Sequence, residues 1–196
     1  MAKRKADIKR KTGETSIVIS LNIDGRGKSK IKTGIPFFDH MLELFAKHGV
    51  FDLNLSAKGD LEVDYHHTVE DIGICLGQAL KKALGKKSGI YRYGEAKVPM
   101  DESLSEIIID ISGRPHLTYN VAFAKKRFVD FDVEVVKEFF EAFTLNAGVT
   151  MHVNLIRGSN MHHIIESIFK AFAVALSKAC EISPRKKGVP STKGIL

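Results

Sequence analysis

The chain of 196 residues has no long apolar run and only two cysteines. No stretch approaches the ~20 apolar residues that a membrane helix needs, so neither a spanning helix nor a membrane partner is expected. The start, Met1-Ala2-Lys3-Arg4-Lys5, is basic without an apolar stretch behind it, and we expect no secretory signal. Cys75 and Cys180 fall in apolar helical segments, which favours reduced core thiols in a cytoplasmic protein.

The charge is unbalanced, with a formal net charge of +7 at pH 7. Most of the excess lies near the ends, because residues 1–11 hold six Lys or Arg against one Asp, and Arg185-Lys186-Lys187 lies near the other end. This distribution argues against nucleic acid as the main partner. Two alternatives stay open, namely solvated basic termini and a ligand that carries phosphate.

One uncommon motif is present twice. His66-His67-Thr68-Val69-Glu70 returns 96 residues later, close to half of the chain length, as His162-His163-Ile164-Ile165-Glu166. The helices that the two motifs begin also match in sequence, at the pairs His66/His162, His67/His163, Glu70/Glu166, Ile72/Ile168, Ala79/Ala175, Leu80/Leu176, Lys82/Lys178 and Ala83/Ala179. An earlier helix aligns His40-Met41-Leu42 with Glu138-Phe139-Phe140. The sequence therefore predicts a duplicated α+β unit, each copy a sheet with two helices on one face.

Apolar periodicity predicts the same order of elements in both halves. In the first half it indicates strands over 16–23 and 51–55 and helices over 37–47 and 66–84. In the second half it indicates strands over 104–111, 116–123 and 149–156 and helices over 133–146 and 161–180. We expect a first half with a basic N-terminal arm over 1–90, a second half over 91–183 and a C-terminal phosphate-binding tail over 184–196.

Helix geometry divides each motif into a chelating pair and a second histidine. Residues four apart lie on one side of a helix, so His66 with Glu70, or His162 with Glu166, can hold one ion. The adjacent histidine is rotated by about 100° and points elsewhere. If the two motifs face each other, each pair receives the second histidine of the other motif. A fourth ligand then comes from the earlier helix.

Two metal sites of four ligands are predicted in this way. One site contains His66, Glu70, His163 and Glu138, and the other contains His162, Glu166, His67 and His40. Imidazole and carboxylate ligands without sulfur fit Mn, Fe, Co or Zn and leave positions open for substrate. Histidines that cap helices are the plainer alternative, but repetition and the accompanying glutamates favour metal. His48, His116 and His152 lie outside the pattern and are interpreted as ordinary.

Basic residues in turns are candidates for holding an anion. Arg92 and Arg114 lie in short turns between predicted strands, where a side chain can face a ligand. Residues 190–194 (PSTKG) combine hydroxyls, a cation and flexible residues, as phosphate-holding loops do. Taken from the residues alone, a solvated surface explains each of them equally well.

Six segments together resemble one enzyme family. They are 34–42 (GIPFFDHML), 64–71 (DYHHTVED), 99–102 (PMDE), 110–115 (DISGRP), 158–163 (GSNMHH) and 190–194 (PSTKG). Over nearly its whole length the chain is similar to the imidazoleglycerol-phosphate dehydratases of histidine biosynthesis. The resemblance implies a duplicated fold of the ribosomal-protein-S5-domain-2-like type. It also implies two Mn(II) ions per active site and a cytoplasmic homo-oligomer, a 24-mer built from trimers with sites shared between neighbours.

Residue roles follow from the same resemblance. Arg92, Arg114, Ser191 and Lys193 fall at positions that hold the substrate phosphate, and Glu14 falls at the position of the catalytic carboxylate. The chain departs from the family at Glu138, where many members carry histidine. A carboxylate can also ligate Mn, and the alignment of this position with His40 supports the role.

The implied activity is dehydration of D-erythro-imidazole glycerol phosphate to imidazole acetol phosphate, a carbon–oxygen hydro-lyase reaction. Each metal ion can bind one ring nitrogen and stabilise an imidazolate, which expels the adjacent hydroxyl to give a diazafulvene. Glu14 would remove the proton from the neighbouring carbon as general base. Asp101 is a second candidate acid or base, or simply an exposed turn carboxylate.

Three other functions fit parts of the pattern. A dinuclear metallohydrolase acting on phosphate esters would release inorganic phosphate. A basic RNA-binding protein with structural metals would bind RNA in a salt-dependent manner and lose that binding on deletion of residues 1–11. A metal-storage cage would not need the set of Arg92, Arg114 and Lys193.

Overall fold

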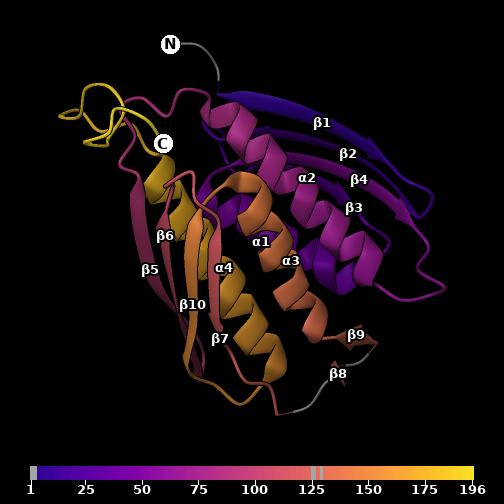
Figure 1. Cartoon of the computed structure of the whole chain (residues 1–196). Coiled ribbons are helices and arrows are strands. Elements are labelled where there is room, and N and C mark those ends of the chain that lie inside the picture. The colour runs from indigo at the N-terminus through magenta and orange to yellow at the C-terminus, as the bar shows by residue number, and fades with distance from the viewer. Residues whose placement is uncertain (1–3, 125–126, 129) are drawn as a thin grey trace.

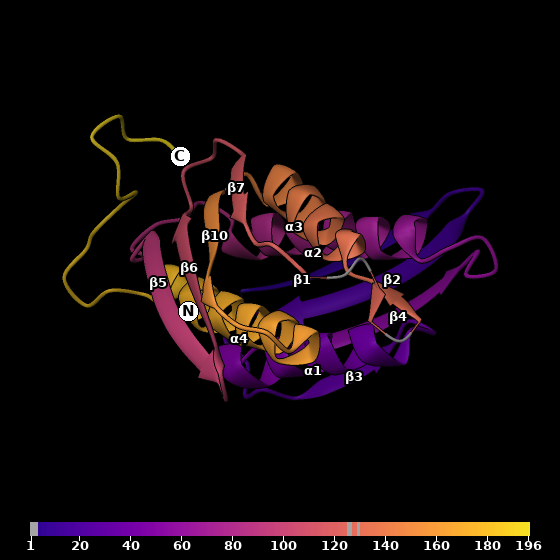
Figure 2. The same ribbon diagram turned by 90° about the horizontal axis from the view of Figure 1, so that it is seen from below.

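Two four-stranded sheets enclose a layer of four helices in the computed structural model, which describes residues 4–124, 127–128 and 130–196 (Figures 1 and 2). The first half contains β1 Lys5–Lys11, β2 Thr15–Asn22, β3 Ser29–Lys32, α1 Pro36–Gly49, β4 Asp52–Gly59 and α2 His66–Leu84. The second half contains β5 Tyr93–Met100, β6 Ser103–Asp110, β7 His116–Asn120, α3 Glu134–Ala147, β10 Thr150–Arg157 and α4 Met161–Cys180. A short hairpin of β8 Arg127–Phe128 and β9 Phe131–Asp132 precedes α3.

The two halves share one topology. The strand order is β1-β2-β4-β3 in one sheet and β5-β6-β10-β7 in the other, so in both the fourth strand lies between the second and the third. In both sheets the fourth strand is antiparallel to the second and parallel to the third. The duplicated α+β unit predicted from the sequence is confirmed by this match. The predicted boundary at residue 90 falls between α2 and β5.

All the strongly periodic segments form the predicted elements, with small shifts at their ends. The strand predicted over 51–55 runs on to Gly59, and the strand predicted over 116–123 ends at Asn120. Five strands were not predicted: β1, β3, β5, β8 and β9. Lys5–Lys11, the larger part of the predicted basic N-terminal arm, pairs with β2 along its whole length. Its lysines stay exposed on the outer face.

The helices of the two halves pack against each other between the sheets, α2 on α3 and α1 on α4. Phenylalanine rings fill this layer, and Phe38 of α1 contacts both Phe139 of α3 and Phe169 of α4 edge-on. Gly73 of α2 brings the helix backbones close, because a Cβ there would lie 2.7 Å from the Phe139 carbonyl oxygen. Each buried phenylalanine contributes roughly 1.5–3 kcal/mol. This packing fixes the helices that carry the histidines.

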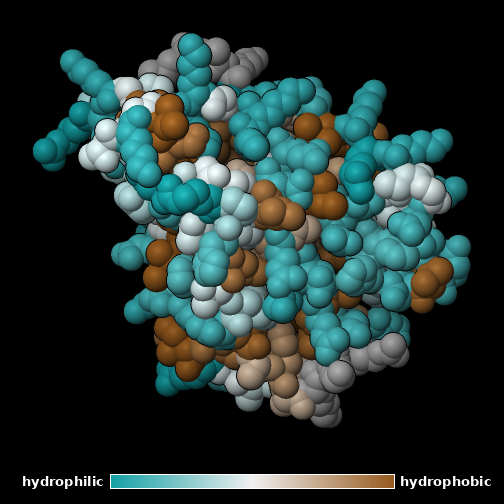
Figure 3. Space-filling view, in the orientation of Figure 1, coloured by the Kyte–Doolittle hydropathy of each residue, from teal (hydrophilic) through white to brown (hydrophobic). Residues whose placement is uncertain are grey.

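The outside of the molecule is mostly polar. Hydrophilic side chains cover most of the face in Figure 3, and the hydrophobic patches between them are separate. Within the described residues, no helix has both the length and the apolar composition that crossing a membrane requires.

Candidate functional site

Each histidine pair stands in the first turn of a helix. The Asn160 side chain accepts hydrogen bonds from the backbone N–H groups of His162 and His163, at 2.9 and 3.4 Å, and so caps α4. The two rings diverge, with centroids 6.2 Å apart and planes at 79°. His66 and His67 at the start of α2 diverge in the same way, at 6.0 Å and 85°. The predicted divergence of adjacent histidines is confirmed.

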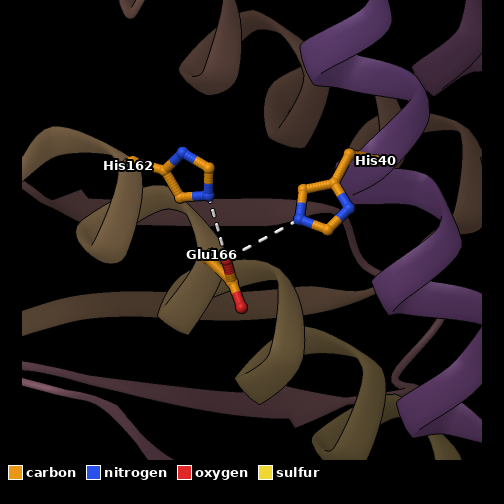
Figure 4. A group of neighbouring side chains, drawn as sticks. All are labelled: His40, His162 and Glu166. Atoms are coloured by element: carbon orange, nitrogen blue, oxygen red, sulfur yellow. Dashed lines mark hydrogen bonds and ion pairs between the residues drawn. The ribbon is translucent and has the colours of Figure 1, made fainter.

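Three ligand-type side chains from both halves converge at one point (Figure 4). His40 comes from α1, His162 and Glu166 come from α4, and one ligand atom from each lies within 4.8 Å of the others. The Glu166 Oε2 atom lies 3.0 Å from Nε2 of His162 and 3.7 Å from Nε2 of His40. Two imidazole nitrogens and a carboxylate oxygen suit a divalent transition metal. The sequence placed all three in one predicted site.

Glu166 is the buried centre of this group, with only 7% of its surface exposed. Its second oxygen lies 2.6 Å from the ammonium of Lys170. Burial alone would raise the pKa of Glu166, but the hydrogen bond and charge of Lys170, followed by those of His162, hold it below the ordinary value. The carboxylate is therefore ionised and ready to bind a cation.

Lys170, which pairs with Glu166, was not identified from the sequence. Burial and then the positive charge of Lys170 lower the pKa of His48, which favours its neutral form, and the charge of Glu166 acts on it in the opposite direction. The four-residue spacing from Glu166 to Lys170 on one helix face was the available signal.

The other chelating pair is more open. Nε2 of His66 lies 3.7 Å from Oε2 of Glu70, and both side chains are 44% exposed. His66 and Glu138 line the same cavity of about 580 Å³. The remaining acidic residues of its lining are Asp64, Asp130, Asp132 and Glu134. A cation suits a cavity with this lining, and the cavity brings His66 and Glu138 to one place as the sequence alignment required.

The second histidines contact carboxylates of their own half. His67 pairs through Nδ1 with Asp60 at 3.0 Å and lies 3.9 Å through Nε2 from Glu14. His163 pairs through Nδ1 with Glu102 at 2.7 Å and lies 3.7 Å through Nε2 from Asp101.

These hydrogen bonds, to Asp60 and to Glu102, raise the pKa of His67 and of His163 above the ordinary value. Within one chain, therefore, neither histidine joins the opposite chelating pair as the sequence analysis expected. The two orienting carboxylates, Asp60 and Glu102, were not identified from the sequence.

The predicted phosphate-binding residues gather around the C-terminal tail. Arg92 donates to both carboxylate oxygens of Asp110, at 2.7 and 3.0 Å, and to the Pro190 carbonyl at 2.9 Å. Its φ of 75° is uncommon for a residue other than glycine, and such backbone strain is often found at functional sites. Ser191 accepts a hydrogen bond from the Lys193 backbone N–H at 3.1 Å. Arg92 thereby holds the tail in place.

Arg114 and Lys193 present exposed charges near the same end of the fold. Both side chains are exposed, and the glycine before Arg114 lies against the last residue, Leu196. Arg114 is held by its backbone, which donates to the Ser112 hydroxyl at 3.0 Å. Two exposed basic side chains beside a hydroxyl-rich tail would suit a phosphate.

The basic set and the histidine set lie at opposite ends of α4. The backbone N–H of Arg92 bonds to the carbonyl of Ala179, near the last turn, whereas His162 is in the first turn. Figure 1 shows the tail leaving that last turn. The helix has 20 residues, which corresponds to about 30 Å. One ligand of ordinary metabolite size cannot contact both sets in a single chain.

Known proteins resemble the chain in sequence and in structure. The family model described as imidazoleglycerol-phosphate dehydratase matches residues 33–176. The imidazoleglycerol-phosphate dehydratases of Geobacter metallireducens and Oceanobacillus iheyensis are 58% and 59% identical over 193 residues, covering 98% of this chain and 99% and 100% of those proteins.

Two solved structures are also similar. The imidazoleglycerol-phosphate dehydratase of Staphylococcus aureus has 43% identity and a TM-score of 0.83, covering 91% of this chain and 99% of that one. The structure from Pyrococcus furiosus, in complex with (S)-C348, has 38% identity and a TM-score of 0.84, covering 96% and 100%.

Proposed function

The chain belongs to the imidazoleglycerol-phosphate dehydratase family, and from this premise we propose that its dehydration of imidazoleglycerol phosphate in histidine biosynthesis uses two Mn(II) ions per active site. The observation that carries the proposal is the convergence of His40, His162 and Glu166 within 4.8 Å. Two imidazoles and an ionised carboxylate are a fitting donor set for such an ion. When bound, the ions would act as Lewis acids that stabilise negative charge on the substrate's imidazole ring.

The proposal assigns one ion to each repeat motif. His40, His162 and Glu166 would hold one ion with His67, and His66, Glu70 and Glu138 would hold the other with His163. The contacts of His67 and His163 within one chain support their delivery from a neighbouring copy, because neither ring faces the opposite pair. The distance along α4 between the histidines and Arg92 supports the same conclusion. We therefore propose a cytoplasmic homo-oligomer, a 24-mer built from trimers, whose sites are shared.

The chain's own residues would perform the remaining work. Arg114, Ser191 and Lys193 would hold the phosphate, while Arg92 keeps the tail in position through Asp110 and Pro190. Glu14 would take the proton from the carbon next to the departing hydroxyl, as general base. Its side chain is 56% exposed at the tip of the β1–β2 hairpin, so a substrate can reach it.

Metal removal tests this function directly. After dialysis against a chelator, we expect turnover of imidazoleglycerol phosphate to fall to background and to return when Mn²⁺ is added, because the Lewis acid is restored. Imidazole acetol phosphate and released inorganic phosphate are measured in the same samples. Full turnover by metal-free protein would contradict the metal requirement. Release of inorganic phosphate would favour the metallohydrolase instead.

The tail offers a test of phosphate binding. Lys193→Met is expected to raise KM about tenfold with little change in kcat, since a hydrogen bond to a charged group contributes roughly 1.5–3 kcal/mol and binds substrate and transition state alike. Lys187→Met is the matched control, because Lys187 is an exposed lysine of the same tail. Steady-state kinetics of both variants give the comparison. Equal KM values for the two variants would remove Lys193 from the phosphate site.

A further inference from the structure

Glu14 and Glu102 occupy equivalent places in the two halves. Each is the last residue of the turn between the first two strands of its sheet, because β2 begins at Thr15 and β6 begins at Ser103. Each also faces the second histidine of its own half, His67 in one case and His163 in the other. The two glutamates are therefore counterparts produced by the duplication.

Both carboxylate oxygens of Glu102 are engaged in hydrogen bonds. Its Oε1 atom accepts hydrogen bonds from the backbone N–H groups of Ser159 and Asn160, at 3.1 and 2.8 Å, and from the Ser103 hydroxyl at 3.0 Å. Its Oε2 atom accepts from Nδ1 of His163 at 2.7 Å. A carboxylate fixed by so many donors is a poor proton acceptor for a substrate.

The Glu14 side chain is held by fewer contacts than the Glu102 side chain. Its contact with His67 is an ion pair of 3.9 Å to Nε2, and its side chain is 56% exposed. In its half Nδ1 of the histidine donates its hydrogen bond to Asp60, at 3.0 Å, a residue that follows β4. A different residue thus holds the histidine of the first half, and the hairpin glutamate stays available.

We propose that Glu102 is a positioning residue, which fixes His163 for metal binding while its counterpart Glu14 serves in proton transfer. The proposal rests on the function proposed above. Because an ionised carboxylate can only accept a hydrogen bond, the ring hydrogen of His163 is held on Nδ1 and the lone pair of Nε2 is left for an ion. The backbone bonds to Ser159 and Asn160 fix the start of α4 at the same time.

The Glu102→Gln substitution separates the orientation of the His163 ring from the support of the start of α4. The backbone N–H groups of Ser159 and Asn160 require an oxygen, so the glutamine must direct its NH₂ group at Nδ1 of His163. The ring hydrogen then moves to Nε2, so the nitrogen that is proposed to bind the ion no longer has a free lone pair. We expect Mn²⁺ affinity at one of the two ions per chain to fall by about 10–100-fold, the usual effect of losing such a partner. The melting temperature stays near that of the wild type.

Glu106→Gln is the matched control. Glu106 lies on β6, which begins directly after Glu102, and the variant loses the same charge, but the partners of Glu106 are Lys97 and Asn154. We expect wild-type Mn²⁺ affinity for this variant. Bound Mn²⁺ is measured on the full-length protein by the electron paramagnetic resonance of the free ion, titrated against a chelator of known affinity.

A double-mutant cycle asks whether Glu102 acts through His163. In a His163→Ala background, Glu102→Gln should change Mn²⁺ affinity by less than about twofold, since the ring that it orients is gone. A role limited to bracing α4 would weaken binding equally in both backgrounds and would overturn the proposal. Glu102→Asp keeps an acceptor-only group and should regain part of the affinity. An aspartate variant that binds no better than the glutamine variant also contradicts the proposal.

The wild-type titration distinguishes failure of the positioning role from failure of the proposed metal dependence. Two tightly bound Mn²⁺ ions in the wild type together with unchanged binding in Glu102→Gln would overturn the positioning role alone. No Mn²⁺ binding by the wild type would overturn the proposed metal dependence, and the positioning role with it.

Discussion

The Glu166→Gln variant is expected to lose at least about 10³-fold in turnover, because a missing Lewis acid costs several kcal/mol of transition-state stabilisation. Glu166 is the residue on which His40, His162 and Lys170 converge. Glutamine keeps the size of the side chain but removes the negative charge that would bind the ion. We expect the variant to be isolated with less than its full complement of metal.

Glu141→Gln provides the matched control for this loss. Glu141 forms an ion pair with Lys137 four residues away, as Glu166 does with Lys170, but on the exposed face of α3. Turnover and metal content should match the wild type, since exposed pairs contribute little. His40→Ala gives a second route to the same result, because the His40 side chain is 46% exposed and its removal leaves the core intact. Full activity in both Glu166→Gln and His40→Ala would contradict the site.

The Glu14→Gln variant is expected to lose about 10²–10⁴-fold in kcat with little change in KM, the range for removing a general base. Metal content should stay at the wild-type value, because Glu14 lies near His67 without being assigned to either ion. The steady-state parameters and the bound metal are measured on the same preparation. The separation of kcat from metal content distinguishes proton transfer from metal binding.

The control for Glu14 is Glu62→Gln, an exposed carboxylate in the loop between β4 and α2. This variant loses the same charge near the same half-site and should retain the wild-type kcat. A Glu14→Gln variant with the kcat of Glu62→Gln would exclude Glu14 from the chemistry. If Glu14→Gln also loses metal, Glu14 would be a metal ligand or would hold a metal ligand in position.

The helices and central strands were predictable because each carries its own local signal. The helix from Met161 to Cys180 repeats apolar residues with helical spacing along its length, and both of its ends agree with the structure. Strands β1 and β5 lack such a signal, because an edge strand has one neighbour and its exposed residues are charged. In Lys5–Lys11 the inward positions include Arg10, which pairs with Asp71 of α2. Its role depends on a partner far away in the sequence.

Helix geometry and the sequence repeat predicted part of the candidate site. His40 was grouped with His162 and Glu166 because its helix aligns with the one that carries Glu138, and these three residues do converge. The contacts of Lys170 followed no repeat, since the aligned position of the first half holds a different residue type. The orienting carboxylates Asp60 and Glu102 come from loops, whose positions depend on tertiary packing rather than on periodicity.

Titration of the metal-free protein with Mn²⁺ tests the central claim most directly. Bound ion and turnover of imidazoleglycerol phosphate are measured at each addition. If two ions act together on one imidazole ring, turnover should follow the fraction of sites that hold both ions and reach its full value only at two ions per chain. Full turnover in metal-free protein, or with a single ion per chain, would contradict the account.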